Sequence, residues 1–512
     1  MSGTFGGILS VARSALRAQQ YAIEVASQNI ANAQTEGYTR TRAVLSPLPV
    51  RHLPYGVIGT GVALTDVARV RDVLLDAAYR REAASASLHE ARAGVLTRVE
   101  TLFAEPSDAS LGAALDRFTD AWSDLANAPA SVPARQVVAQ RGQQVAQWLN
   151  GADARLTQFQ AGTYARLEEQ VGRMNQLFRQ IADLNGQIVP MESNGATAAP
   201  LRDQRDRMLD ELATMAGAEA LENSDGSVNV IVAGQTMVDQ TRASTFNAPS
   251  LVNGTARLTL GLSSEPVSVR TGSVAGLLET YNTDVPGLRA ELDRIATALV
   301  HGVNRWHRTG HTPAGDAQNA AGEAYDPATP AALRGSRIDF FASPAGTVPG
   351  VTPTVTARDI RLSDAVLADV NVVAAGRGGW NGTAVVAQPG DNSIAVAIAG
   401  LRTATTFPDD THAGTTDPPA QVGLPGLGGR SVADAWRSTV TTLGLGVSDA
   451  TADQEAGDAL RQQADQRRQA VSAVSIDEEL IGLTKAQQSY QAAARVIAVV
   501  QEMTADLMSL VR

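Results

Sequence analysis

Histidine is the residue type whose clustering could hold a metal in this chain, because the sequence contains no cysteine. His301, His307 and His311 lie close together, and Asp316 follows them. The i, i+4 spacing of His307 and His311 could place two imidazoles on one face of a helix, as a metal site requires. Gly310 lies between these two histidines and a proline follows, which predicts that the helix ends there. We therefore predict no metal and no cofactor.

A phosphate-binding loop and a catalytic centre are the two other kinds of site to consider in this sequence. Gly56, Gly59 and Gly61 could suggest a phosphate-binding loop, but no Lys-Ser/Thr pair follows, and the next residues alternate as in a strand. The acidic residues are numerous but spread along helix faces, and neither a nucleophile elbow nor a pair of catalytic carboxylates stands out. The sequence predicts no catalytic residue and no enzyme.

Composition restricts the possible partners and the cellular location. The chain has 512 residues, which predicts two to four domains, and 44% of them are hydrophobic, as in folded proteins. The net charge is -11 and no long basic run exists, so we expect no nucleic-acid partner. No stretch of about 18 apolar residues occurs, which predicts no membrane insertion. The first 20 residues lack a basic segment followed by an apolar core, so no cleaved secretory signal is expected.

The clearest periodic signal lies near the N-terminus. Leucine, isoleucine, alanine and glutamine alternate there at steps of three and four, at Leu9, Ala12, Leu16, Gln19, Ile23, Ala26 and Ile30. This heptad seam is narrow, because small or polar residues occupy every second position. A lone helix with so little apolar surface is marginal in water, so the seam predicts a partner helix. Packing of this helix on its own domain stays an open alternative.

A second long helix is predicted at the C-terminus. Ser475 and Glu478 fit an S-x-x-E capping box, and Asp477 and Glu479 add negative charge at the positive end of the helix dipole. Apolar residues then recur at helical spacing, at Ile476, Leu480, Leu483, Tyr490, Ala494, Ile497, Val500, Leu507 and Leu510. Glutamines interrupt this stripe, so it is also a weak seam. We expect the two terminal helices to pair with each other and with neighbouring subunits.

The subunit-interface residues predicted from these two seams are the large seam residues, namely Leu9, Leu16, Ile23, Ile30, Leu480, Leu483, Tyr490, Ile497 and Leu507.

Short sequence blocks at both ends resemble one family. The run NIANAQTEGYTR, with Asn29, Asn32, Thr35, Gly37 and Tyr38, resembles the N-terminal signature of flagellar rod, hook and hook-associated proteins. Residues 56–72, GVIGTGVALTDVARVRD, are similar to the next block of that family. The C-terminal run SIDEELIGLTKAQQSYQAAARVIAVVQEM resembles its C-terminal block. Matching blocks at both ends are more specific than either block alone.

Interior segments resemble the hook-associated members in particular. These segments are residues 102–135, 201–217 and 272–310, and hook and rod proteins are expected to lack them. In residues 201–217 the charges fall opposite Leu201, Met208, Leu209 and Leu212, so we expect a solvated face there. Residues 222–269 alternate and contain Asp225-Gly226 and Asn253-Gly254 turns, which predicts short antiparallel strands.

These patterns together predict a mainly α fold with β-rich modules and nested, discontinuous domains. Residues 1–40 with 472–512 form an α-helical coiled-coil terminal domain. Residues 41–310 with 430–471 form a mainly helical domain with a small β element near 222–270. Residues 311–429, rich in Ala, Gly, Thr, Pro and Asp, form a β-rich outer module, and a helix resumes near Ser431.

The resemblance implies a structural role. It implies a subunit that joins the distal end of the flagellar hook to the filament and is exported by the flagellar type III apparatus. It also implies hook protein, a second hook–filament junction protein and further copies in a ring as partners, with an export chaperone at the C-terminal region. The expected location is extracellular, at the hook–filament junction. Another axial subunit, either hook or distal rod protein, is the main alternative, and a flagellum-associated cell-wall hydrolase is a weaker one.

Overall fold

The structure is a computed structural model that describes the chain in several stretches. They are residues 2–35, 37–53, 56–103, 105–193, 195, 197–263, 265–311, 338–342, 355–377, 379–380, 385–386, 388, 390–408 and 421–510.

Two compact units make up the chain, and each combines separate stretches of sequence. Unit 1 contains Met1–Ala91, Arg166–Leu278 and Ala452–Arg512, and unit 2 contains Arg92–Ala165 and Glu279–Thr451. The predicted fold class, mainly α with small β elements in a nested arrangement, is confirmed. The three-part domain division with its boundaries stays a prediction.

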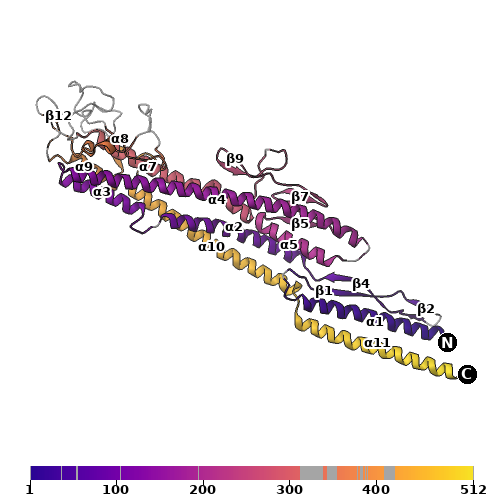
Figure 1. Cartoon of the computed structure of the whole chain (residues 1–512). Helices are drawn as coiled ribbons and strands as arrows, with labels where there is room; N and C mark the ends of the chain where they lie inside the picture. Colours follow the sequence, from indigo (N-terminus) through magenta and orange to yellow (C-terminus); the bar gives the residue numbers. More distant parts are fainter. Residues whose placement is uncertain are drawn as a thin grey trace. The chain divides into compact units, whose positions relative to one another are not determined.

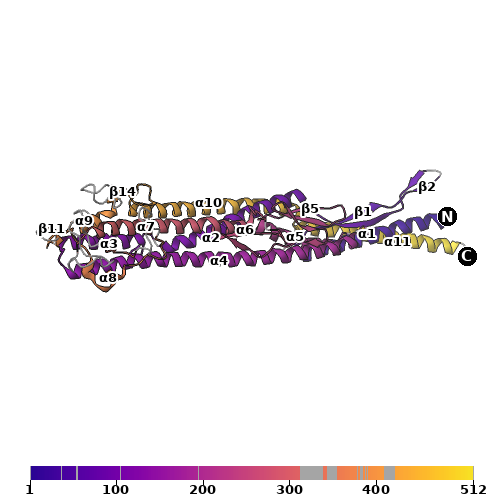
Figure 2. The ribbon, with the colours of Figure 1, turned by 90° about the horizontal axis from the view of Figure 1, so that it is seen from above.

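Unit 1 contains the two terminal helices, α1 (Ser2–Ala31) and α11 (Ile476–Leu510). They lie side by side and antiparallel, with the N- and C-termini at the same end of the pair (Figures 1 and 2). The residues of α1 that are buried are mostly small, namely Ala12, Ala18, Val25, Ala26 and Asn29. Small side chains let two helix backbones approach closely, and the predicted pairing of the terminal helices is therefore confirmed.

The other helical parts of unit 1 belong to helices in the middle of the chain. They are the first part of α2 (Val73–Phe103), the last part of α4 (Val132–Glu192), α5 (Ala199–Ala216), α6 (Gly272–Glu279) and the last part of α10 (Val432–Ser472). Leu184 and Ile188 of α4 pack with Ala198 beside α5 in a small apolar cluster. Gly217, with φ +63°, ends α5, as the αL cap requires.

Two kinds of sheet belong to unit 1. An antiparallel ribbon, β1 (Thr41–Pro47) with β4 (Val62–Arg69), packs against α1, and β2 (Arg51–Leu53) pairs with β3 (Gly56–Ile58). A four-stranded antiparallel sheet and a separate hairpin occupy the region predicted to be β. The strands are β5 (Glu219–Glu222), β6 (Val228–Val232), β7 (Gln235–Asp239), β8 (Arg242–Ala243), β9 (Ser250–Val252) and β10 (Thr255–Arg257). The predicted turns at Asp225-Gly226 and Asn253-Gly254 separate β5 from β6 and β9 from β10.

Unit 2 is built around helices and contains short strands. Its elements are the remaining parts of α2, α4 and α10 with α3 (Leu111–Asn127), the π-helical turn η1 (Thr280–Asp284), α7 (Val285–Arg308), α8 (Asp364–Ala368), η3 (Val370–Val372), α9 (Ser393–Ala399), η4 (Gly400–Arg402), β11 (Gly379–Trp380), β12 (Val385–Val386), β13 (Thr406–Pro408) and β14 (Gln421–Gly423). Helix α7 ends at Arg308, before Gly310, and α10 begins after Ser431, as predicted.

The core of unit 2 combines α3 and α7 with residues from the stretch 311–429. Phe118 and Trp122 of α3 contact Phe340, and Phe340 stacks edge-on against Phe341 at a ring distance of 5.0 Å. Ile394 of α9 is also fully buried. The described part of 311–429 therefore contributes to the unit 2 core, and its short helices accompany paired strands. The rest of the predicted β-rich module, including Asp316, lies outside the described residues.

His307 fixes this stretch to α7 through both ring nitrogens. Its Nε2 accepts a hydrogen bond from Ala374 N at 3.1 Å, so the proton lies on Nδ1, which is 2.6 Å from Ile338 O. The side chain is fully buried, with Trp122 and Phe340 beside the ring. Burial lowers the pKa of His307 to about 4. His307 therefore stays neutral and is structural rather than a metal ligand.

The buried His307 predicts a loss of stability in mild acid. Its pKa of about 4 in the folded protein lies below the ordinary value of 6.5 in the unfolded chain. The contribution of neutral His307 to the free energy of unfolding is complete above pH 6.5. It is lost as the pH falls from 6.5 to about 4, and the loss amounts to about 3 kcal/mol. Between pH 7 and pH 4, the melting temperature should therefore fall more steeply with pH for wild type than for His307→Gln. The control His89→Gln, at a partly exposed position, should keep the wild-type slope, and an unchanged slope in His307→Gln would contradict the assignment.

Candidate functional site at the base of the terminal helices

The signature loop after α1 is a compact turn built by its own residues. Asn32 Nδ2 donates to Gln28 O at 2.9 Å, and Thr35 Oγ1 donates to Asn32 Oδ1 at 3.3 Å. The backbone N–H groups of Thr35 and Tyr38 donate to the carbonyls of Asn32 and Thr35. These bonds stop the helix and reverse the chain, as expected for asparagine and threonine at a helix end.

Gly37 is required in this loop for two reasons. Its φ of +73° is a conformation that L side chains rarely adopt. A Cβ at this position would also lie 2.5 Å from Arg207 Cδ of α5, so a larger residue would displace that side chain. The glycine therefore lets the loop lie directly against α5.

Asn29 is the central residue of the cluster that we call the terminal clasp, which comprises Asn29, Tyr38, Arg40, Thr41, Glu478 and Glu479. Asn29 is fully buried, and its Oδ1 accepts from Tyr38 Oη at 2.9 Å and from Thr41 N at 3.0 Å. Its Nδ2 donates to Thr41 O at 2.8 Å and to Glu479 Oε2 at 3.0 Å. One amide thus joins α1, the start of β1 and the first turn of α11.

Arg40 is the second bridging residue of the clasp. Its Nε donates to Glu479 Oε1 and its Nη1 to Glu478 Oε2, both at 2.8 Å. Its backbone N–H donates to Ser472 O at 3.0 Å, and its carbonyl accepts from Val70 N at 2.8 Å. Arg40 therefore fixes the end of α10, the end of β4 and the start of α11 relative to one another.

The first turn of α11 carries three acidic residues, Asp477, Glu478 and Glu479. The N-terminal end of a helix stabilises negative charge. Ser475 Oγ accepts from Glu478 N at 3.5 Å, which is a long capping contact, and the Glu478 carboxylate contacts Arg40. The capping-box prediction is right about the helix start, but the carboxylates of this turn bind Arg40 and Asn29 from the N-terminal part of the chain.

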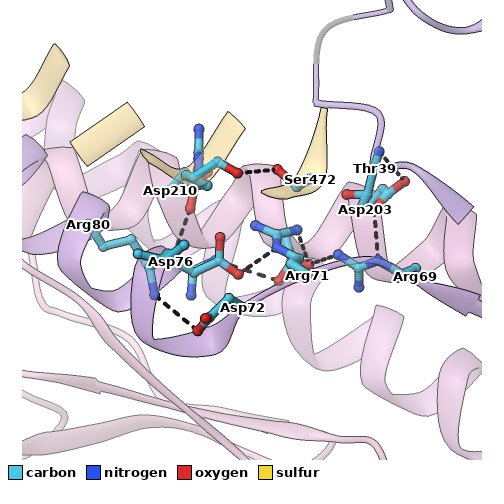
Figure 3. A network of polar contacts seen from close by, with 12 residues as sticks. Thr39, Arg69, Arg71, Asp72, Asp76, Arg80, Asp203, Asp210 and Ser472 are labelled. Carbon is cyan, nitrogen blue, oxygen red and sulfur yellow. Dashed lines mark hydrogen bonds and ion pairs between the residues drawn. The ribbon is translucent and has the colours of Figure 1, made fainter. Parts of the chain in front are cut away.

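A second cluster, which we call the arginine–aspartate network, lies next to Thr39 (Figure 3), the residue between Tyr38 and Arg40 of the clasp. Its members are Arg69, Arg71, Asp76, Arg80, Asp203, Asp206, Asp210, Asp465 and Arg468. Asp203 of α5 connects the two clusters, because its Oδ2 accepts from Thr39 N at 3.2 Å while its Oδ1 is 2.9 Å from Arg69 Nε.

Asp206 lies at the centre of this network and is contacted by three arginines. It pairs with Arg69, with Arg71 Nη1 at 2.5 Å and with Arg80 Nη2 at 3.5 Å. Burial by itself would raise the pKa of Asp206, but Arg71, Arg69 and Arg80 outweigh it and hold the pKa below the usual value. Asp206 is therefore ionised and acts as a shared counter-ion.

Asp210 extends the network to α10. It accepts from Arg80 Nε and from Arg468 Nη1, both at 2.7 Å. Arg468 also pairs with Asp465 at 2.8 Å, and its guanidinium lies 3.7 Å from the ring centre of Tyr79 on α2. Ion pairs and a cation–π contact thus join α2, α5 and α10.

The prediction of a solvated charged face on residues 201–217 is wrong. Asp203 is 5% exposed and Arg205 is 1% exposed. Arg205 donates to Asn185 Oδ1 at 2.9 Å and to Gly226 O at 2.7 Å, which links α5 to α4 and to the β5–β6 turn. The spacing of Asp203, Asp206 and Asp210 on one helix face was the available signal, but their partners are distant in sequence.

A pocket of about 430 Å³ lies between the signature loop, α5 and the end of α10. Its charged lining, including Arg71, Asp206 and Arg468, belongs to the network. Opposite charges are paired there, which suits holding elements together rather than catalysis. Within the described residues, no group of three or more His, Asp or Glu side chains could hold a metal ion.

The predicted seam residues are only partly covered within one copy. Leu9, Leu16, Ile23, Ile30, Leu483, Tyr490 and Ile497 are half-buried, and Leu480 is 46% exposed. Leu507 belongs to α11, but its side chain is outside the described part. Among the described residues, those that are buried on the two helices are Ala12, Ala18, Val25, Ala26 and Asn29 on α1 and Glu479, Ala486 and Val500 on α11. Contact of the seam residues with other subunits stays a prediction.

Comparison with known families gives three matches along the chain. Residues 9–39 match the family described as Flagella basal body rod protein. Residues 96–322 match the Flagellar hook-associated protein FlgK helical domain. Residues 465–510 match the Flagellar basal body rod FlgEFG protein C-terminal family. The first match contains Asn29 and Tyr38 of the terminal clasp, and the third contains Glu478 and Glu479.

Individual relatives agree with these families. The chain is 27% identical over 543 residues to Flagellar hook-associated protein 1 of Bacillus subtilis (strain 168), covering 98% of this chain and 97% of the relative. It is 28% identical over 321 residues to the protein of the same name from Salmonella typhimurium, covering 60% of this chain and 58% of the relative. The fold is similar to that of the flagellar hook junction protein FlgK from Burkholderia pseudomallei, with a TM-score of 0.56, 16% identity and coverage of 77% and 100%.

The chain is a structural protein of the bacterial flagellum, in the class of rod, hook and hook-associated proteins, and its family is not one of enzymes. Among the described helices, none combines the length and the apolar character of a membrane span. Within this class, the chain is similar to flagellar hook-associated protein 1 over nearly its whole length.

Removal of the Asn29 amide should loosen the base of the terminal helices. Asn29→Ala leaves the Glu479 carboxylate and the Thr41 backbone short of partners in a buried place, which costs roughly 2–3 kcal/mol. Hydrogen-exchange mass spectrometry should show faster exchange in residues 20–31 and 476–485. The control Gln20→Ala, at an exposed position of the same helix, should exchange like wild type. Equal protection in Asn29→Ala would mean that the clasp does not hold the helices.

Neutralisation of Asp206 should destabilise unit 1. Asp206→Asn leaves three guanidinium groups without their shared counter-ion and should lower the free energy of unfolding by about 3 kcal/mol at pH 7. Because the pKa of Asp206 is held below its usual value, this stabilisation is complete above the unfolded-state pKa of about 4 and is lost only as the pH falls through the lower pKa of the folded protein. Urea unfolding from pH 7 into acid should therefore show a difference between wild type and variant that stays constant to about pH 4 and shrinks below it. The matched control is Asp183→Asn on the exposed face of α4, which should change the result little.

Proposed function

We propose that this protein joins the distal end of the flagellar hook to the filament. The observation that carries the proposal is the terminal clasp, in which the N-terminal signature residue Asn29 and the C-terminal residue Glu479 bind each other. It makes one helical hairpin from the two ends of the chain. The described fold is a scaffold held by ion pairs and packing, which suits a mechanical part.

The terminal domain of this proposal consists of residues 1–40 with 472–512. Its half-buried seam residues, such as Leu16, Ile23 and Ile497, contact neighbouring copies in a ring. Helical and ring-like packing of identical subunits is heterologous, so one face of a copy binds a different face of the next. Hook protein and a second hook–filament junction protein are the proposed partners at the two ends of the ring.

Export by the flagellar type III apparatus, without a cleaved signal peptide, is part of the same proposal. An export chaperone would bind the C-terminal region. Half-buried and exposed apolar residues along α11, including Ile481 at 70% exposure and Val499 at 52%, give such a partner a surface. The protein would then act outside the cell, at the hook–filament junction.

Another axial subunit, hook or distal rod protein, is the second candidate. The matches at both ends of the chain are to rod-protein families, and they fit an axial subunit as well as they fit a junction protein. The interior match over residues 96–322 is to a hook-associated helical domain and favours the junction role. The two roles differ in what a cell lacking the protein can build.

A clean deletion should leave complete hooks without filaments and release filament subunits into the medium. The reason is that, in the proposed role, the filament subunits lack the joint through which they attach to the finished hook. Electron microscopy of the cells and immunoblotting of the medium are the measurements. The intact gene supplied on a plasmid should restore filaments, whereas a variant with Arg40→Glu should restore fewer, since its clasp is broken. Normal filaments in the deletion would refute the junction role, and loss of the hooks would favour the alternative.

A further inference from the structure

Two charged stripes on the terminal helices have complementary order and spacing. On α1 the stripe contains Arg13, Arg17 and Glu24, at positions i, i+4 and i+11. On α11 it contains Arg495, Glu502 and Asp506, at positions i, i+7 and i+11. At about 100° per residue, each set lies within a narrow strip of its helix.

All six side chains are exposed, and none belongs to an ion pair within the part of the chain that the structure describes. Each stripe also faces away from the α1–α11 contact. On α1 the buried residues Ala26 and Asn29 lie on the opposite side of the helix from the stripe. On α11 the buried residues Ala486 and Val500 likewise lie opposite Arg495.

We propose that the α1 stripe of one copy binds the α11 stripe of a second copy, antiparallel, in one register. This register pairs Arg13 with Asp506, Arg17 with Glu502, and Glu24 with Arg495. The inference rests on the proposed function, because it supplies the contact between neighbouring copies in the ring. The stripes face outward on opposite sides of the hairpin, so the contact is heterologous and repeats from copy to copy.

The charges select this register because all three pairs form together. The spacing along α1 is four and then seven residues, and the spacing along α11 in reverse is also four and then seven. A slip of one helical turn would break at least two pairs or bring like charges together, which is unfavourable. Tyr21 is 46% exposed and lies beside the α1 stripe, and Val499 is 52% exposed and lies along the α11 stripe. In the proposed register these two side chains are at the same height along the helices, so the contact would cover both.

The register also sets the displacement between neighbours. Within one copy, Asn29 lies opposite Glu479. In the proposed contact the α11 of the second copy is shifted by about 11 residues relative to that internal register, or roughly 16 Å along the helices at 1.5 Å per residue. Neighbouring hairpins are therefore staggered rather than level.

Disulfide cross-linking tests the register directly, because the chain has no cysteine of its own. The variant with Arg17→Cys and Glu502→Cys is produced in a deletion strain, and isolated flagella are oxidised and run without reductant. We expect a ladder of covalent multimers. The matched control combines Arg17→Cys with Arg495→Cys on the same stripe, displaced by about 10 Å, and should stay monomeric. A ladder in the control but not in the test pair would overturn the register.

Charge reversal tests whether the pairs matter for assembly. The variants Arg13→Glu/Arg17→Glu and Glu502→Arg/Asp506→Arg should each reduce the fraction of cells with filaments by about tenfold, because like charges then face each other. All four changes in one chain should restore that fraction to within about twofold of wild type. The control Arg166→Glu/Arg179→Glu, on exposed positions of α4, should resemble wild type.

The outcomes separate this inference from the proposed function. If the wild-type chain is present in flagella but the combined variant fails to recover and the test pair gives no ladder, the stripe contact is wrong and the junction role stands. If the wild-type chain is absent from isolated flagella, the proposed function fails first. Secreted protein, measured in the medium for every variant, shows that a loss of filaments comes from assembly rather than from export.

Discussion

A buried carboxylate at the start of α11 determines how the two ends of the chain meet. Glu479 is 6% exposed, and an ionised group removed from water is costly unless it is paired and hydrogen-bonded. Asn29 and Arg40 supply those bonds, and the positive end of the helix dipole adds to them. Because Asn29 precedes the signature loop and Arg40 follows it, Glu479 can be satisfied only when the loop has its observed conformation. The clasp therefore couples helix pairing to loop folding.

The loop is coupled in turn to α5 and α2. Gly37 allows the loop to approach Arg207, and Thr39 donates its backbone N–H to Asp203, which also pairs with Arg69. From there the charges alternate through Asp206 to Arg80. Each charged residue in this series of ion pairs has a partner on at least one other element. Moving one element would therefore leave charges on the others unpaired. Such a network gains specificity of arrangement more than stability, because burial of each ion offsets much of the attraction.

Local features of this fold could be predicted from the sequence, and long-range ones could not. Helical periodicity, the Asn-Gly and Asp-Gly turns and the helix end before Gly310 depend on near neighbours. The bond between Asn29 and Glu479 joins residues 450 positions apart, and no local pattern points to it. The charged residues of α5 looked solvated because their arginine partners come from β4, α2 and α10. The burial of Phe340 and Phe341 in unit 2 was hidden by the polar, glycine-rich composition around them.

The seams leave large apolar side chains of the terminal helices only partly covered within one copy. The heptad pattern predicts two weak helices, and the buried side chains of the helix pair, which include Ala12, Ala26 and Ala486, are mostly small. Each buried methyl group contributes only about 0.8 kcal/mol, so this inner face allows close approach but adds little stability. Leu16, Ile23 and Ile497 are left half-buried at its sides, and the charged stripes are left outside. Within one copy, small side chains and the clasp at one end therefore hold α1 and α11 together. The larger apolar groups and the charged groups along the two helices stay available for the contacts between copies that we propose.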